Sequence, residues 1–283
     1  MKILNNKKSL RDYIETIKKE GKTIGFAPTM GALHNGHLSL YQNARRENDI
    51  IIGSIFVNPT QFNNAKDLEK YPRTIEKDLT LLSETGNIDA VYLPEIEDIY
   101  PNGTKSKSYD FDGLENEMEG KFRAGHFDGV GTVVEELFRQ VEPDTAYFGE
   151  KDFQQLAIIK KLVEKLHLPI IIKPVEIVRE ANGLAMSSRN QRLTEEGREK
   201  AKVIFEILNE ANHDFKNNKS ANEIREVVKE KFEKIEGYDL EYVSIADEKT
   251  LKEVPHFEEN GNYRIFIAVF TEGVRLIDNV HLG

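Results

Sequence analysis

Two histidines three residues apart, His34 and His37, have the spacing in this chain that points most directly to chemistry. They follow a short apolar run, residues 23–28, and open a segment with helical spacing. Imidazoles at this spacing lie on one face of a helix. At a helix N-terminus, unpaired backbone N–H groups and the helix dipole attract phosphate. A second polar cluster at residues 186–190 lies far downstream, and the two together indicate a nucleotidyl transferase.

Other interpretations of these histidines are weaker. A lone His-x-x-His is usually a pair of turn residues, but here the strand–turn–helix context and the second cluster favour phosphate. A zinc site needs at least one more ligand, and none stands nearby at suitable spacing. The Gly-x-Gly-x-x-Gly and Walker lysine motifs are absent, so nicotinamide chemistry and P-loop hydrolysis rank lower.

Two more strand ends carry polar side chains. Asn58 and Gln61 follow the apolar run 50–57. Amides there suit a neutral hydroxyl or carbonyl group, although a capped turn fits the pattern equally well. Gly149 and Lys151 stand at another strand-to-helix corner. The glycine permits close backbone approach, and the lysine offers a point charge for phosphate.

Further polar residues extend these corners. Asp152 can accept hydrogen bonds from ribose hydroxyls, and Gln155 lies one helical turn away on the same side. The polar segment 63–73 is long enough to act as a lid over a reactive intermediate. Arg123 and His126 occupy a glycine-punctuated loop. They either neutralise an anionic substrate or are incidental charges of a surface loop.

Composition narrows the class of protein. The 283 residues carry a formal net charge of −10, from 39 Lys and Arg against 49 Asp and Glu. Without a segregated basic stripe this charge argues against nucleic acid as a partner. No apolar stretch approaches the roughly 20 residues that span a bilayer, and the first residues lack the apolar core of a secretory signal. The chain has no cysteine, which excludes disulfides and thiolate metal sites. We therefore expect a cytoplasmic protein without a membrane partner.

The first part of the chain alternates short apolar strands with helical patterns. This rhythm predicts an α/β fold with a doubly wound parallel sheet whose ligands lie at the carboxyl ends of the strands. From about residue 179 strands follow helices without alternation, which predicts a smaller C-terminal α+β domain. The expected domains are 1–178 and 179–283, with a polar hinge at 179–190. The expected helices are 10–17, 37–47, 75–83, 130–141, 153–166, 194–215 and 220–235, and the expected strands are 23–28, 50–57, 90–93, 145–148, 169–178, 240–245, 264–270 and 274–277.

Six segments, in order along the chain, resemble the pantothenate synthetase (pantoate–β-alanine ligase) family of the nucleotidylyltransferase superfamily. They are residues 28–38, 56–62, 71–73, 125–127, 148–152 and 185–190. The resemblance implies a homodimer, a Rossmann-like N-terminal domain, and a smaller C-terminal lid domain that closes over ATP. It also implies that ATP with Mg²⁺ activates pantoate as pantoyl adenylate, releasing pyrophosphate. β-Alanine then forms pantothenate and releases AMP.

By position, the resemblance also implies residue roles. The catalytic residues are His34, His37, Lys151 and Arg189. The residues around ATP are Met30, His37, Gly149, Lys151, Asp152, Val178, Met186, Ser187, Ser188 and Arg189. Pantoate is bound by Gln61 and Gln155, with Met30 lining the entrance. Asp78 stands where relatives place a magnesium-associated carboxylate, although Lys77 occupies a neighbouring position that can be acidic in relatives.

Neither implied step needs a protein nucleophile, because the substrates supply both. The rival interpretation is another nucleotidylyltransferase with the His-x-Gly-His type of motif, such as a cytidylyltransferase or a fragment of a class I aminoacyl-tRNA synthetase. The acidic balance and the lack of a tRNA-binding module disfavour the synthetase. A nucleotide-sensing module is a third alternative, but a sensor has no need of Gln61, Gln155 and a lid.

Overall fold

The computed structural model describes residues 1–283 as two compact units. Unit 1 comprises residues 1–115, 119–150 and 155–176, and unit 2 comprises residues 116–118, 151–154 and 177–283. The main division follows Glu176, whereas the sequence places the boundary after Val178. The short segment 151–154 belongs to unit 2 although it stands between two parts of unit 1. No helix is both long and apolar enough to cross a membrane.

Unit 1 is built on a six-stranded parallel sheet with strand order β1-β4-β3-β2-β5-β6. Its strands are β1 (Lys2–Leu4), β2 (Ile24–Thr29), β3 (Ile50–Ile55), β4 (Ala90–Tyr92), β5 (Thr145–Gly149) and β6 (Ile171–Val175). The chain winds outward from β2 in one direction and from β5 in the other, so the strand order reverses between these two strands. Ligands bind at such a reversal in doubly wound folds.

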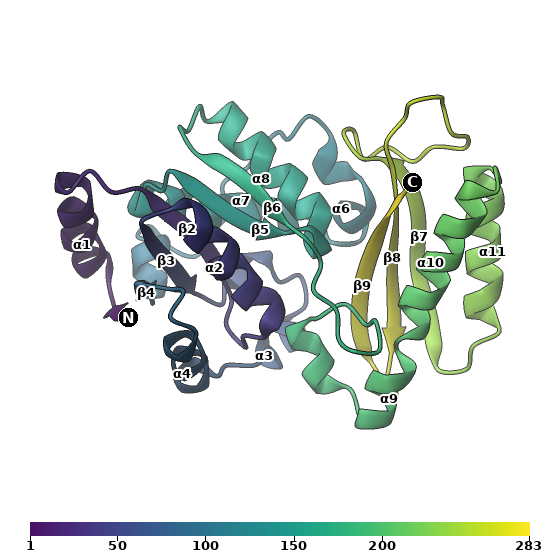
Figure 1. Ribbon diagram of the computed structural model, residues 1–283, viewed down its shortest axis with the longest axis horizontal. Coiled ribbons are helices and arrows are strands. Elements are labelled where there is room, and N and C mark those ends of the chain that lie inside the picture. Colours follow the sequence, from purple (N-terminus) through teal and green to yellow (C-terminus); the bar gives the residue numbers. More distant parts are fainter. The chain divides into compact units, whose positions relative to one another are not determined.

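Helices cover both faces of this sheet (Figure 1). The longer ones are α1 (Lys7–Lys19), α2 (Asn35–Glu47), α4 (Ile75–Thr85), α7 (His126–Val141) and α8 (Phe153–Lys165). Short helical segments are η1 (Pro59–Gln61), α3 (Ala65–Glu69), α5 (Ile96–Ile99), η2 (Leu114–Asn116), α6 (Met118–Phe122) and η3 (Glu150–Asp152).

Successive residues of β2 show why the sheet is buried on both sides. Ala27 packs with Tyr41 of α2 in one buried cluster, and the Tyr41 hydroxyl donates to the Ala27 carbonyl at 3.3 Å. Phe26 points to the other face, where its ring lies 6.3 Å from that of Phe138 on α7. Because neighbours on a strand face opposite ways, a continuously apolar strand needs cover on both sides. The prediction of a doubly wound parallel sheet is confirmed.

Unit 2 contains a three-stranded antiparallel sheet with the order β7-β8-β9 (Figure 1). The strands are β7 (Tyr238–Asp247), β8 (Tyr263–Thr271) and β9 (Val274–Leu282), and the helical segments are η4 (Ser188–Arg192), α9 (Glu195–Lys200), α10 (Val203–Lys216) and α11 (Ala221–Glu233). Apolar residues of α10 and α11 pack with those of the sheet in one core, which includes Leu208, Phe232 and Ile267. The predicted α+β character of this part is confirmed.

The prediction of one continuous helix over residues 194–215 is wrong. The structure divides it into α9 and α10 around Ala201 and Lys202. At the start of α9, Gly197 lies against Glu272, whose carboxylate accepts hydrogen bonds from Thr194. Periodicity gives no sign of this tertiary contact. The sequence also missed β1, a three-residue edge strand paired with β4.

A buried carboxylate, Glu135 on α7, ties the segment before η2 to the helix. It accepts hydrogen bonds from Tyr109 at 2.6 Å and Arg139 at 2.8 Å, and it pairs with Lys107 at 2.9 Å. Burial acts to raise the pKa of Glu135, but the bonds from Tyr109, Lys107 and Arg139 outweigh it and hold the pKa below its usual value.

This depressed pKa predicts a pH dependence of stability. The contribution of Glu135 is present above its unfolded pKa, about 4.3, and is lost as the pH falls through the lower folded value. Glu135→Gln should therefore lower the thermal unfolding midpoint near pH 7, and the difference from the parent protein should shrink below about pH 4. Circular dichroism melts across this range measure it, with the exposed Glu164→Gln as a control. A difference that does not vary with pH would contradict the prediction.

Candidate functional site

Three neighbouring strands of unit 1 deliver the predicted residues to one edge of the sheet. His34 follows β2, Asn58 follows β3, and Gly149 ends β5. These strands are adjacent and parallel, so their carboxyl ends meet at the same edge. The placement agrees with the rule for ligand sites in doubly wound sheets.

The two histidines form a reciprocal cap at the start of α2. The Nδ1 atom of His34 accepts the Gly36 N–H at 3.1 Å, and the Nδ1 atom of His37 accepts the His34 N–H at 3.4 Å. Their ring centroids lie 4.1 Å apart. Because each Nδ1 accepts, the proton of each neutral ring is on Nε2. Both imidazoles are therefore held as Nε2–H donors at a helix N-terminus, which suits phosphate oxygens.

A buried carboxylate holds the loop before the histidines. Asp78 on α4 accepts the Ala32 N–H at 2.9 Å on Oδ2 and the Leu33 N–H at 2.8 Å on Oδ1. The Thr74 hydroxyl donates to the same carboxylate. Gly31 and Ala32 have positive φ angles of 83° and 50°. A left-handed alanine is strained, so these bonds stabilise a backbone shape that would otherwise be disfavoured.

The side chain of Gln61 is buried just after β3. Its Nε2 lies 3.2 Å from the Met30 sulfur, and its Oε1 accepts from Asn58 at 3.0 Å. Asn58 also donates to the Gly129 carbonyl and accepts from the buried Tyr100 hydroxyl. Burial raises the pKa of Tyr100, which keeps this hydroxyl a donor. Met30 and Gln61, predicted to bind the same substrate, are in contact.

The backbone of Gln61 is held by His126 and Arg123, the two side chains whose role the sequence left open. His126 Nδ1 donates to the Gln61 carbonyl at 2.8 Å, and Arg123 donates to the same oxygen at 3.2 Å. His126 is buried at the start of α7, so it is no incidental surface charge. A Cβ on Gly129 would lie 2.5 Å from the Thr60 carbonyl, so glycine is required for this close approach of α7 and η1.

Gly149 and Gln155 complete the predicted residues of unit 1. A Cβ built on Gly149 meets no atom within 4 Å, so this strand end faces open space. Gln155 is half-buried near the start of α8. In the predicted lid segment 63–73 the structure contains the short helix α3.

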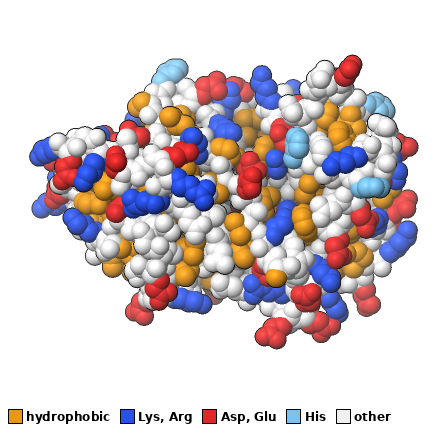
Figure 2. All heavy atoms as spheres, in the orientation of Figure 1, with side chains coloured by type: hydrophobic (Ala, Val, Ile, Leu, Met, Phe, Trp, Pro, Cys, Tyr) orange, Lys and Arg blue, Asp and Glu red, His pale blue; other side chains and the backbone are white.

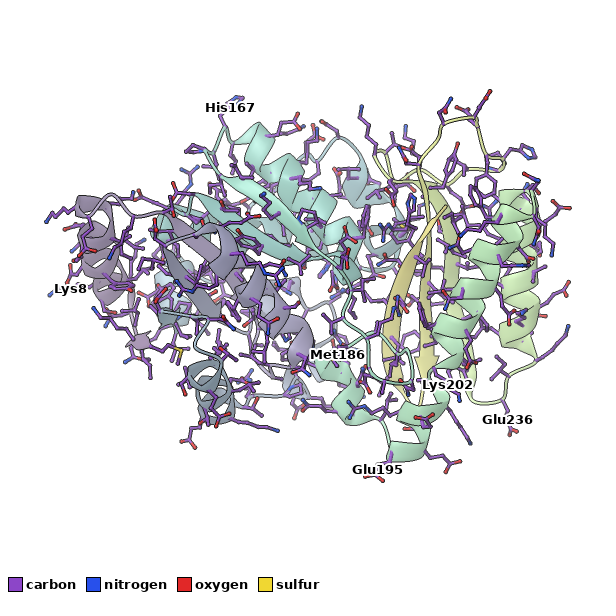
Figure 3. All side chains as sticks on the ribbon, in the orientation of Figure 1. Lys8, His167, Met186, Glu195, Lys202 and Glu236 are labelled. Carbon is purple, nitrogen blue, oxygen red and sulfur yellow. The ribbon has the colours of Figure 1, made fainter.

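Unit 2 contains the remaining predicted residues, and two of them pair directly. The Met186 N–H donates to the Val178 carbonyl at 3.0 Å, which closes a hairpin whose turn contains Gly183 with φ of 97°. Both residues are among those predicted to lie around ATP. Arg179 secures the hairpin by donating to the Gly183 carbonyl at 3.0 Å. Met186 is labelled in Figure 3.

The predicted phosphate cluster follows this hairpin. Ser187 caps η4 by accepting the Arg189 N–H at 3.2 Å, and Ser188 is buried. Asn190 anchors the segment by donating to Glu180 and to the Ala185 carbonyl. These bonds hold the backbone of this cluster in one arrangement.

Lys151, a predicted phosphate-binding residue of unit 2, lies in η3. Its Nζ is 3.9 Å from a carboxylate oxygen of Asp152, whose side chain is half exposed. The Lys151 carbonyl accepts from Asn279 of β9 at 2.9 Å. Sequence reasoning did not identify Asn279, Tyr100 or the loop contacts of Asp78, because each depends on partners distant in sequence.

Comparisons with known proteins show the family to which the chain belongs. The family described as "Pantoate-beta-alanine ligase" matches residues 2–281. The chain belongs to the pantoate–β-alanine ligase family. The pantothenate synthetase of Flavobacterium psychrophilum is 51% identical over 282 residues, covering 100% of both chains.

Solved structures show the same fold. A crystal structure of pantothenate synthetase from Thermus thermophilus has a TM-score of 0.91 and 37% identity, covering 100% of this chain and 99% of that one. A structure of pantoate–β-alanine ligase from Francisella tularensis, complexed with β,γ ATP and β-alanine, has a TM-score of 0.80 and 36% identity, covering 99% and 97%. The chain is therefore an enzyme, a pantoate–β-alanine ligase.

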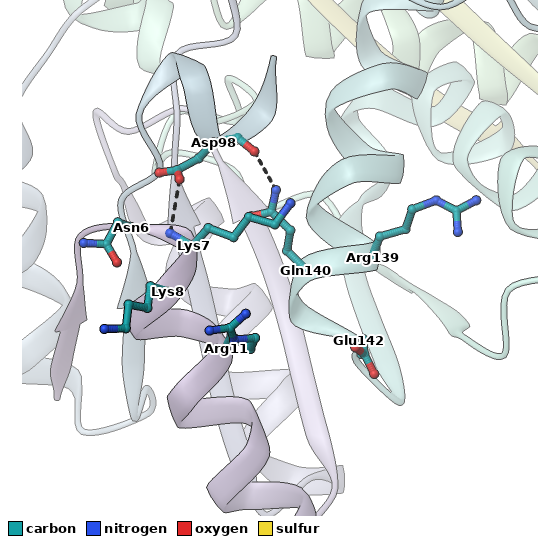
Figure 4. A pocket seen from close by; sticks show the side chains of 8 residues that line it. All are labelled: Asn6, Lys7, Lys8, Arg11, Asp98, Arg139, Gln140 and Glu142. Atoms are coloured by element: carbon teal, nitrogen blue, oxygen red, sulfur yellow. Dashed lines mark hydrogen bonds between the residues drawn. The ribbon is translucent and has the colours of Figure 1, made fainter. Parts of the chain in front are cut away.

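A hollow of about 520 Å³ in unit 1 lies where α1 begins and α7 ends (Figure 4). Lys7 and Arg139 line it, but Lys7 pairs with Glu136 at 3.1 Å and Arg139 pairs with Glu135 at 2.8 Å. On the face shown in Figure 2, acidic and basic side chains are likewise interspersed. We assign this hollow no part in the ligase reaction.

The contacts of Asp78 predict that its carboxylate stabilises the loop before His34. Asp78→Asn turns an amide toward the Ala32 or Leu33 N–H, so unfolding should become easier by about 1–3 kcal/mol. Urea unfolding measures the change. The neighbouring Lys77→Gln is the control, and it should stay within about 0.5 kcal/mol of the parent, as surface substitutions do. Equal stability of Asp78→Asn and the parent protein would refute this role.

Proposed function

We propose that this ligase makes pantothenate from pantoate, β-alanine and ATP in two steps. A carboxylate oxygen of pantoate attacks the α-phosphorus of ATP, and the bond to the bridging oxygen breaks. This releases pyrophosphate and leaves pantoyl adenylate. The amine of β-alanine then attacks the acyl carbon, loses a proton, and displaces AMP. The ATP and β-alanine ligands of the Francisella tularensis structure support this choice of substrates.

The observation that carries the proposal is the pair of Nε2–H donors at the N-terminus of α2, beside strand ends that also carry Gln61 and Gly149. Hydrogen-bond donors fixed before the reaction stabilise charge that grows on phosphate oxygens. Both attacking groups come from the substrates, so the protein acts by positioning and by charge stabilisation. A chain without cysteine can perform this chemistry.

The proposed residue roles follow the two units. In unit 1, His34 and His37 bind phosphate, Gly149 lies beside the ribose, Gln61 and Gln155 bind pantoate, and Met30 lines the entrance. In unit 2, the phosphate residues are Lys151, Ser187, Ser188 and Arg189, with Asp152 at the ribose and Val178 and Met186 at the adenine.

Magnesium is proposed to enter with ATP, where it neutralises charge on the triphosphate. No group of three or more His, Asp or Glu side chains in the structure could hold a metal ion. Asp78 as a magnesium ligand stays a prediction, and its carboxylate already accepts two backbone N–H groups. These contacts favour holding the loop over direct metal ligation.

The homodimer, the lid action of unit 2 and the cytoplasmic location also remain predictions. Analytical ultracentrifugation tests the first. The reaction itself is tested by AMP release that requires both pantoate and β-alanine. A product that carries the nucleotide would instead identify another nucleotidylyltransferase.

Substitution of His34 can separate its role as the N-cap of α2 from its proposed role as a hydrogen-bond donor to phosphate. Asparagine is a preferred N-cap, so His34→Asn should keep α2 capped and the thermal midpoint near that of the parent. It lacks the Nε2 donor, so pantoate-dependent exchange of pyrophosphate into ATP should fall roughly 10²–10³-fold. Alanine at His34 should lose both the cap and the donor.

His37→Ala and Lys151→Ala should show a similar loss of roughly 10²–10³-fold in exchange. Near-parental exchange in His34→Asn, His37→Ala and Lys151→Ala together would reject the proposed phosphate site.

Open space at Gly149 gives a second, independent prediction. A methyl group there meets no protein atom within 4 Å, so Gly149→Ala should leave the thermal midpoint unchanged. If ATP approaches this backbone, the methyl displaces it, and kcat/KM for ATP should fall about 10- to 100-fold. Steady-state kinetics at saturating pantoate and β-alanine measure the change. An unaltered kcat/KM for ATP would show that the nucleotide does not pass close to Gly149.

A further inference from the structure

Asn279 on β9 is a buried amide on the sheet face opposite to the helical core of unit 2. Its exposed fraction is 2%, whereas Val274, Leu276 and Leu282 of the same strand face α10 and α11. Side chains alternate between the two faces along a strand, so Asn279 points away from that core. A buried amide requires hydrogen-bond partners, and those of Asn279 lie far away in the sequence.

The two ends of this amide hold different partners. Its Nδ2 donates to the Lys151 carbonyl at 2.9 Å, and its Oδ1 accepts from Arg264 of β8 at 2.6 Å. Arg264 also donates to Glu248 at 2.7 Å, so its guanidinium is fixed from two sides. The acceptor end of Asn279 therefore fixes the amide, and its donor end reaches the backbone of Lys151.

The residues after Lys151 pack on the same sheet face. The guanidinium of Arg264 lies 4.2 Å from the centre of the Phe153 ring, and that ring lies 5.8 Å from Phe266 of β8. The Gln154 amide donates to the Glu117 carbonyl at 2.8 Å. Phe153 and Gln154 thus secure one end of the turn, while Asn279 supplies the bond to Lys151 itself.

We propose that Asn279 is a positioning residue for Lys151 in adenylate formation. It acts through the Lys151 carbonyl, which sets where the lysine side chain begins. The inference rests on the proposed role of Lys151 at the phosphates. Loss of this one bond keeps the lysine charge but shifts the point at which its side chain begins. A displacement of about 1 Å can slow an enzyme by up to roughly 10²-fold.

Two substitutions separate this role from a merely structural one. Asn279→Asp keeps the shape and still accepts from Arg264, but it cannot donate to the Lys151 carbonyl. Asn279→Ala removes both contacts. Pantoate-dependent pyrophosphate exchange should fall about 10- to 100-fold in both variants, because both lose the donor. If support of Arg264 were the role, Asn279→Asp would restore exchange, and that result would overturn the proposal.

A double-mutant cycle with Lys151→Ala completes the test. If Asn279 acts only through Lys151, Asn279→Asp should change the residual exchange of Lys151→Ala by less than about twofold, since coupled residues are not additive. An equal loss in both backgrounds would overturn the proposal. Glu241→Gln removes the ion pair with Arg275 of β9 and should leave exchange near that of the parent.

The outcomes also distinguish this inference from the proposed function. Normal exchange in Lys151→Ala would reject the phosphate role of Lys151, and the positioning role with it. Impaired exchange in Lys151→Ala beside normal exchange in both Asn279 variants would reject the positioning role alone. Thermal midpoints, measured for every variant, confirm that exchange is compared among folded proteins.

Discussion

The reciprocal contact of His34 and His37 orders the proposed phosphate site of unit 1. Each Nδ1 accepts a backbone N–H at the start of α2, so both rings are fixed in orientation and in tautomer. The same two bonds satisfy N–H groups that a helix end leaves without partners. Helix capping and the proposed phosphate binding therefore require the same geometry, because a ring that rotated away would uncap the helix.

The segments that carry the proposed site residues are held in a similar way. In each case a buried polar side chain from a distant part of the sequence bonds to the backbone of the segment. Asp78 holds the loop before His34, His126 holds the carbonyl of Gln61, and Asn279 holds the carbonyl of Lys151. Contact with the backbone fixes where the side chain of each proposed site residue begins. Such buried groups are costly unless they are fully bonded, so they also favour one arrangement of the segment.

Strand β9 supports the two predicted ATP-binding segments of unit 2 from consecutive residues. Asn279 bonds to the Lys151 turn on one face of the sheet. Asp278 faces the other side and pairs with Arg179, which braces the hairpin leading to Met186. Burial raises the pKa of Asp278, and the ion pair with Arg179 opposes that shift. Strand β9 thus links segments that are separated along the chain.

Patterns in the amino-acid sequence were enough to establish the alternation of strands and helices, the placement of polar residues at strand ends, and the family resemblance. These are local properties, because periodicity and turn residues report on a few neighbouring positions. The folded chain was needed to establish that β2, β3 and β5 are adjacent, that His126 bonds to the Gln61 carbonyl, and that the segment 151–154 belongs to unit 2. The break between α9 and α10 likewise became visible only in three dimensions. Each of these features depends on hydrogen bonds and packing between residues far apart in the chain, which no local pattern encodes.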